Sequence, residues 1–86
     1  MKNIKWDIVK SERLKRTRGV SFEEMLEAKL VAIRKHPKRI KQNIMLFSYK
    51  RYIWVVPYAE EKNIIFFKTL YPSRKYTKQY KEGKIK

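Results

Sequence analysis

The residues best suited to chemistry lie near the C-terminus, in the run Pro72-Ser73-Arg74-Lys75. Pro72 suits the first turn of a helix, because its missing N–H would have no partner there. The N–H groups of the next three residues are therefore expected at a helix N-terminus, where the helix dipole attracts anions. Arg74 can hold two phosphate oxygens at once, whereas a lysine acts as a point charge. The run predicts a phosphate site; the alternative is a helix cap with solvated basic side chains.

Three further side chains near this run could support such a site. Lys68 lies on the preceding apolar strand, and we expect it beside Arg74, which would hold a phosphate and its developing charge. Tyr76 and Tyr80 are four residues apart and therefore share one face of the expected helix. They either stack on bases or pack on the sheet, and packing is favoured.

The single histidine, His36, is the obvious candidate for a general acid or base, because histidine is the side-chain type whose ordinary pKa lies near neutrality. The alternative is a loop residue that ends a strand before Pro37. With no cysteine and no paired carboxylates nearby, His36 cannot assemble a metal cage, so no metal or other cofactor is expected. Arg39, with Lys38 and Lys41, forms either a rim that follows phosphates or a solvated loop.

Composition restricts the class of protein. The 86 residues allow one domain, spanning 1–86, in which 81–86 is expected to be a flexible basic tail. The 23 lysines and arginines against 8 acidic residues give a net charge of +15, which suits nucleic acid, an anionic membrane or an acidic protein partner. No apolar stretch is long enough for a signal peptide or a membrane span, so a cytoplasmic location is expected.

Two helices are expected in the first third of the chain. Asp7 suits the N-cap of a polar helix that Gly19 would end in the left-handed conformation. Ser21 and Glu24 have the spacing of a capping box, which starts a second helix at Phe22. Apolar residues at helical spacing, the later of which are either helix or strand, predict one buried face. They are Phe22, Met25, Leu26, Leu30 and Ile33.

The pattern then changes to alternation typical of strands. Three segments rich in β-branched and aromatic residues predict sequential antiparallel strands, at 44–49, 53–58 and 64–70. Short strands are also expected at 4–6 and 30–36. Two N-terminal helices, an antiparallel β-meander of three to four strands and a short C-terminal helix make an α+β domain with its helices on one face of the sheet.

Several motifs occur in an order that is specific for one family. They are Trp6-Asp7, Lys10, Leu14, Arg18-Gly-Val-Ser-Phe-Glu-Glu24, His36-Pro37, Val55-Val-Pro-Tyr58 and Phe67-Lys-Thr-Leu-Tyr-Pro-Ser-Arg-Lys-Tyr-Thr-Lys-Gln-Tyr80. Over nearly its whole length the chain resembles the BrnT-like toxins of bacterial type II toxin–antitoxin systems, which are small RelE-fold ribonucleases. Arg18 stands where many relatives have histidine, and the Lys50-Arg51 turn lacks the glycine usual there.

The resemblance implies a metal-independent ribonuclease that cleaves RNA through its 2′-hydroxyl, either free or on the ribosome, and so inhibits translation and growth. It also implies neutralisation by a ribbon-helix-helix or CopG-like antitoxin in a hetero-oligomeric complex. The candidate catalytic residues are Arg74, Lys68, His36 and Tyr80. The candidate RNA- or phosphate-binding residues are Ser73, Lys75, Lys10, Arg18, Arg39 and Tyr76.

A non-catalytic RNA- or DNA-binding module is the alternative, because the charge and exposed aromatic side chains would suffice for binding. Arg74→Ala separates the two hypotheses. In an enzyme it should abolish cleavage and leave much of the binding, whereas in a binder it should weaken affinity slightly and reduce the salt dependence by about one charge. A membrane-surface protein fits less well, since neither the first nor the last helix joins a broad apolar face to its basic one.

Overall fold

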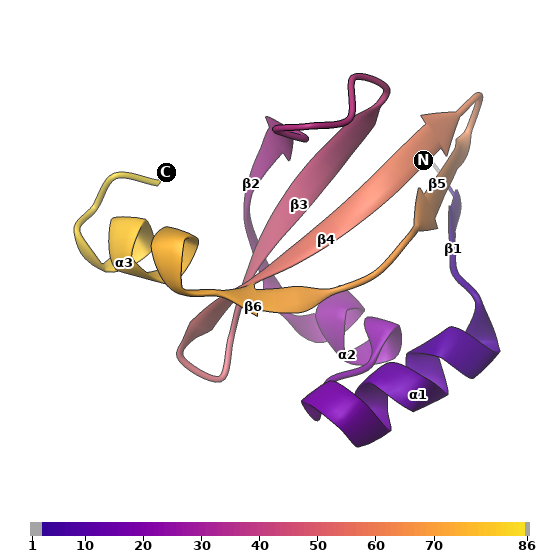
Figure 1. Cartoon of the computed structure of the whole chain (residues 1–86), viewed down its shortest axis with the longest axis horizontal. Coiled ribbons are helices and arrows are strands. Elements are labelled where there is room, and N and C mark those ends of the chain that lie inside the picture. Colours follow the sequence, from indigo (N-terminus) through magenta and orange to yellow (C-terminus); the bar gives the residue numbers. More distant parts are fainter. Residues whose placement is uncertain (1–2, 86) are drawn as a thin grey trace.

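Residues 3–85 are described by the computed structural model, and they form three helices and a six-stranded sheet (Figure 1). In chain order the elements are β1 (Asn3–Lys5), α1 (Ile8–Arg18), α2 (Phe22–Glu27), β2 (Lys29–Lys35), β3 (Gln42–Tyr49), β4 (Tyr52–Glu61), β5 (Ile64–Phe67), β6 (Tyr71–Ser73) and α3 (Arg74–Lys81). The expected α+β class is confirmed.

The signals that start and end α1 and start α2 are confirmed. The Asp7 side chain accepts the N–H of Lys10, and Gly19 ends α1 with φ of 79°. Ser21 and Glu24 form the expected capping box, in which each side chain accepts the other residue's backbone N–H. These are local interactions between residues at fixed spacing, which is why the sequence reveals them.

The buried face of α2 is shorter than predicted. Phe22 and Met25 are buried, whereas Leu26 and Leu30 are each 47% exposed. Ala28 has an extended backbone, so α2 ends at Glu27 and the chain enters β2 directly. The helical spacing of Leu30 and Ile33 is therefore accidental, because both residues belong to β2.

The sheet is mixed, with strand order β1-β5-β4-β3-β2, and β6 pairs with the first half of β4. β2 to β5 form the expected antiparallel meander. The expectation of a wholly antiparallel sheet is wrong, because β1 runs parallel to β5, with Ile4 opposite Ile65. Two helices, α1 and α2, and three strands separate β1 from β5 along the chain, so no local sequence pattern indicates this pairing.

Pro72 lies in a strand and not in the first turn of a helix, which corrects a second expectation. It is opposite Trp54 in the β4–β6 register, at the outer side of a short strand where a missing N–H is tolerated. The helix α3 begins two residues later, and the hydroxyl of its N-cap, Ser73, accepts the N–H of Tyr76 at 3.1 Å. The N-terminus of α3 is thus capped by the residue expected to bind phosphate.

Helices cover both faces of the sheet, whereas helices on one face were expected (Figure 1). On the first face, α1 and α2 pack over a cluster that includes Leu14, Phe22, Phe47 and Phe67. On the second face, Tyr76 and Tyr80 of α3 pack against a separate cluster: Ala32, Ile44, Leu46, Ile53, Val55 and Ile85. Packing of the two tyrosines on the sheet, the favoured alternative, is confirmed.

The C-terminal residues are held to the second face and do not form a free basic tail as far as residue 85. Gly83 turns the chain after α3 with φ of 75°, and the N–H of Lys84 donates to the carbonyl of Gln79 at 2.8 Å. Ile85 is only 6% exposed. One apolar side chain among the basic residues is enough to anchor this segment.

Candidate functional site

A depression of about 380 Å³ lies on the second face, beside the part of the sheet that α3 covers. Pro57 shares this face because it lies opposite Ile44 of the second cluster, and Gln42 is two residues before Ile44 on β3. We call this hollow the basic depression. Its lining residues are Lys10, His36, Arg39, Gln42, Pro57, Lys68, Thr69 and Tyr71. They include several cations and no carboxylate, so the hollow attracts anions.

Four of the residues proposed from the sequence meet in this depression: Lys10, His36, Arg39 and Lys68. Lys10 comes from α1, and His36 directly follows β2. Arg39 lies in the loop between β2 and β3, and Lys68 lies in the segment after β5. The fold therefore gathers basic side chains that lie far apart in the chain. Such a gathering of N–H donors and positive charge suits a phosphodiester.

Lys68 is placed by an extension of the β4–β5 pairing. Its N–H donates to the carbonyl of Pro57 at 2.8 Å. Because Phe67 is buried on the first face, the exposed side chain of Lys68 emerges on the second face. Its Nζ lies 5.1 Å from the centre of the Phe66 ring. An aromatic ring thus supports the ammonium group at the border of the depression.

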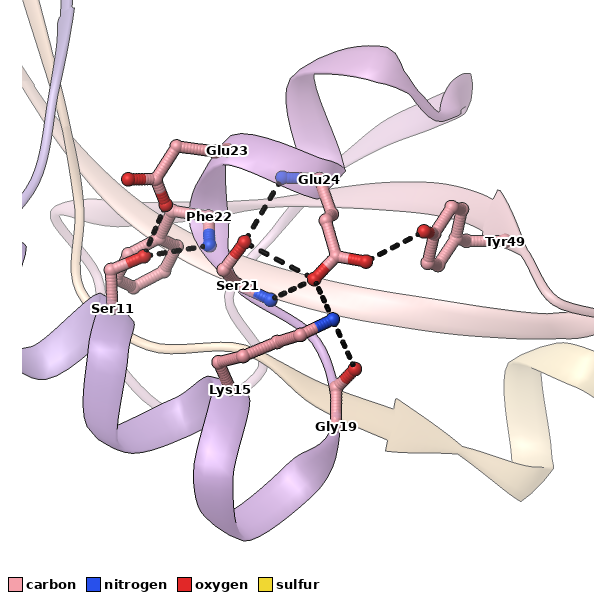
Figure 2. A network of polar contacts seen from close by, with 8 residues as sticks. All are labelled: Ser11, Lys15, Gly19, Ser21, Phe22, Glu23, Glu24 and Tyr49. Carbon is pink, nitrogen blue, oxygen red and sulfur yellow. Dashed lines mark hydrogen bonds and ion pairs between the residues drawn. The ribbon is translucent and has the colours of Figure 1, made fainter.

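Lys10 is placed by α1, which polar contacts attach to α2 (Figure 2). The neighbouring residue, Ser11, is 1% exposed; its hydroxyl donates to Glu23 at 2.5 Å and accepts the N–H of Phe22 at 3.0 Å. The hydrogen bond from Ser11 is the main reason that the pKa of Glu23 is lowered. These contacts fix the orientation of α1 beside the depression.

The next residue of α2, Glu24, joins α1, α2 and the sheet (Figure 2). Its carboxylate accepts from Nζ of Lys15 at 2.7 Å, from the hydroxyl of Tyr49 at 2.8 Å and from the N–H of Ser21 at 3.1 Å. These donors, chiefly Lys15, lower the pKa of Glu24 to about 2. The hydrogen bond between Tyr49 and Glu24 also raises the pKa of the Tyr49 hydroxyl. The network supports the site without touching it.

His36 has a defined orientation. Its Nδ1 accepts the N–H groups of Lys38 at 3.0 Å and Arg39 at 3.1 Å. An accepting Nδ1 places the proton of the neutral ring on Nε2, which is then a donor. In this arrangement Nε2 cannot take a proton from a substrate. His36 is therefore suited to donate a hydrogen bond to an anion, and it also shapes the loop that carries Arg39.

Tyr71 lines the depression and was not among the predicted site residues. It lies opposite Val55 in the β4–β6 register, which turns it to the second face. Burial raises the pKa of its hydroxyl, and Tyr76 contributes to the rise, whereas the charge of Arg18 opposes it. Its hydroxyl therefore keeps its proton at neutral pH and can donate. The only signal in the sequence was its place in the Leu-Tyr-Pro-Ser segment.

Arg18 does not line the basic depression. Its guanidinium donates to the backbone carbonyl of Leu70, in the segment that leads from Lys68 to Tyr71. This contact ties the end of α1 to that segment. Arg18 thus positions the backbone of the site, and its charge partly offsets the rise in the pKa of Tyr71.

The remaining predicted residues lie on β6 and α3, and none of them lines the basic depression. Arg74 lines a separate hollow of about 380 Å³ with Tyr52 and Lys78, so the expected placement of Lys68 beside Arg74 is not found. Lys75 is exposed, with Nζ 5.7 Å from the ring centre of Tyr76. The hydroxyl of Ser73 caps α3, and the rings of Tyr76 and Tyr80 pack on the sheet.

Within residues 3–85, no three or more His, Cys, Asp or Glu side chains are grouped so that they could hold a metal ion. In the same part of the chain, no helix is both long and apolar enough to cross a membrane.

The fold is similar to that in a crystal structure of the Brucella abortus ribonuclease toxin BrnT. The TM-score is 0.57 at 16% sequence identity, and the match covers 85% of this chain and 97% of that chain. Neither a protein-family model nor a curated protein matches the sequence. At this identity the likeness establishes the fold, and it confirms at that level the resemblance that the motifs indicated.

Proposed function

We propose that the protein is the toxin of a toxin–antitoxin pair and that it cleaves RNA at the basic depression. The observation that carries the proposal is the convergence of Lys10, His36 and Lys68 on one hollow of a fold that a ribonuclease toxin shares. The residues come from distant parts of the chain, so their meeting is a property of the fold and not of a single basic segment.

The reaction that suits this site is attack by the 2′-hydroxyl of RNA on the adjacent phosphorus. The 2′-oxygen forms a bond to phosphorus and gives up its proton to water, while the bond to the 5′-oxygen breaks and that oxygen takes a proton. The products are a 2′,3′-cyclic phosphate and a 5′-hydroxyl. Negative charge grows on the phosphate oxygens in the transition state, and Lys10 and Lys68 would hold it. Arg39 would bind the same or a neighbouring phosphate.

Proton transfer needs groups that can donate and accept at the two oxygens that react. Tyr71 retains its proton, because burial raises its pKa, and it is our candidate donor to the departing 5′-oxygen. His36 would donate from Nε2 to a phosphate oxygen, since backbone N–H groups occupy Nδ1. This assignment replaces the role of general acid or base that its residue type suggested.

The toxin half of the proposal requires an inhibitor protein. Three apolar side chains support its binding at the β2 side of the first face: Leu26, Leu30 and Ile33, which are 47%, 47% and 51% exposed. Leu30 and Ile33 lie opposite Phe47 and Met45 of the first cluster, so both belong to that face. An antitoxin with acidic and apolar segments would cover them and offset the net charge. Co-expression with the product of an adjacent small reading frame should restore growth.

The first test is incubation of the purified protein with a defined, ribosome-free RNA in EDTA, beside the same RNA with 2′-deoxy nucleotides. We expect cleavage of the RNA alone, with 2′,3′-cyclic phosphate ends. Intact RNA that remains bound in every lane would refute cleavage of free RNA. If the protein also binds RNA on ribosomes without cleaving it, the non-catalytic nucleic-acid-binding module is favoured. The basic hollow around Arg74 could then contribute to that binding.

A further inference from the structure

Beside the basic depression, a further and largely apolar hollow of about 510 Å³ lies where the end of β4 meets the start of β5. Ala59, Ile64 and Phe66 line it together with Glu61, Lys62 and Lys68. Lys68 lines both hollows, so the two lie next to each other on the second face of the sheet. A ligand that spans more than one group could therefore occupy both.

The apolar lining is unusual for a sheet face that no helix covers. β5 reads Ile64-Ile65-Phe66-Phe67, and its first-face residues Ile65 and Phe67 are 9% and 1% exposed. Its second-face residues Ile64 and Phe66 are 39% and 37% exposed. Uncovered faces of sheets normally carry polar side chains. Since α3 packs at the other end of this face, the two apolar side chains remain open to a partner.

The charges around Phe66 indicate what that partner is. Lys68 holds its ammonium 5.1 Å from the ring centre, and Lys5 lies opposite Phe66 in the β1–β5 register. An aromatic ring with a lysine directly after its own strand and another on the neighbouring strand matches single-stranded nucleic acid, in which a flat base lies between two phosphates. The arrangement is less suited to an apolar protein segment, which would leave the two lysines without counter-charges.

We propose that the hollow over Phe66 is a subsite for one nucleobase, namely the base next to the phosphate that the basic depression holds. The base packs on Phe66 and Ile64 when the ammonium of Lys68 moves from the ring to the phosphate. Glu61, at the wall of the hollow, can accept a hydrogen bond from an exocyclic amino group. This inference rests on the proposed function for the identity of the nucleic acid, and it adds a source of base preference.

The test is binding of short, uncleavable 2′-deoxy-substituted RNAs in which one base at a time is removed. Wild type, Phe66→Leu and Phe66→Trp are compared at fixed salt, after thermal unfolding has shown that each variant is folded. In wild type, loss of the base in the subsite should weaken binding by about 5- to 150-fold. Phe66→Leu should abolish that loss at this one position alone, and Phe66→Trp should retain it.

Equal losses for wild type and Phe66→Leu at every position would overturn the subsite, because a contact between Phe66 and one base makes the loss at that position depend on residue 66. That result would mean that Phe66 contacts something other than a base, such as a protein partner. Cleavage of all-ribose RNA by wild type is measured separately. Its absence would refute the ribonuclease proposal and leave the binding comparison intact, so the two failures are distinguishable.

Discussion

Replacement of Glu24 by glutamine should lower stability at neutral pH by removing a charge without removing the shape of the side chain. The amide oxygen of glutamine can still accept from Lys15 and from the N–H of Ser21, so the variant isolates the contribution of the charge. The relevant quantity is the free energy of unfolding. It depends on the pKa of Glu24 in the folded and unfolded chains.

The magnitude follows from the pKa of Glu24, which falls from an ordinary value of 4.5 to about 2 in the folded chain. At about 1.4 kcal/mol for each pKa unit, the upper bound is about 3 kcal/mol. The side chains of Glu24 and Lys15 are 22% and 53% exposed, so water screens the pair. We therefore expect Glu24→Gln to cost about 1–2 kcal/mol.

The direction of the pH dependence is fixed by the lowered pKa. The charged form of Glu24 is favoured in the folded chain, so its contribution is complete above about pH 5 and is lost as the pH falls through 4.5 towards 2. Urea unfolding of wild type and Glu24→Gln at neutral pH and at about pH 3 gives the free energy of unfolding of each protein at each pH. The difference in that free energy between the two proteins should shrink at the lower pH.

The matched control is Glu27→Gln, which removes an equal charge from an exposed position on the same helix. It should change stability by less than Glu24→Gln does at neutral pH. An equal loss for both variants would show that net charge matters and the network does not. A difference between wild type and Glu24→Gln that stays constant with pH would refute the reasoning from the pKa.

Variants at three further positions test how the strands and α3 are held. Thr77→Val should lower the free energy of unfolding in urea by about 1–3 kcal/mol. The reason is that the buried hydroxyl of Thr77 accepts the N–H of Ile53 and donates to the carbonyl of Ser73. Thr77→Ser, which keeps the hydroxyl, should recover part of the lost stability. Ile85→Ala should cost about 2 kcal/mol if the C-terminal segment is anchored, and no change would mean that it is free. Arg51→Gly should raise the melting temperature, since its φ of 68° in the β3–β4 turn costs about 1 kcal/mol for a side chain with a Cβ atom.

The sequence predicted the parts of the fold that depend on neighbours in the chain. Asp7, Gly19 and the Ser21–Glu24 box could be read because each cap uses residues at fixed spacing. The parallel pairing of β1 with β5 could not, since it depends on how distant segments meet. Pro72 shows the same limit: proline suits both an outer strand and a first helical turn, and pairing with Trp54 decides between them.

The candidate site was predicted in its residue types and less well in its grouping. Lys10, His36 and Lys68 were proposed separately, and the fold brings them together. Arg74 was expected beside Lys68 because Lys68 lies on the strand that precedes it, six positions earlier in the chain. Extended chain advances about 3.3 Å per residue, so those six residues can carry Arg74 about 20 Å along β4. The pairing of β6 with β4 turns Tyr71 towards the depression, and no local sequence pattern could reveal that pairing.

The central claim is that RNA is cleaved at the basic depression and not at the N-terminus of α3. The most direct measurement compares the single-turnover cleavage rate of Lys10→Ala with those of Arg74→Ala and of Lys29→Ala, an exposed position on β2 that lines neither hollow. We expect a loss of about 100-fold or more for Lys10→Ala. We expect the other two variants to cleave RNA at rates much closer to that of wild type. Loss of cleavage in Arg74→Ala with full activity in Lys10→Ala would contradict it.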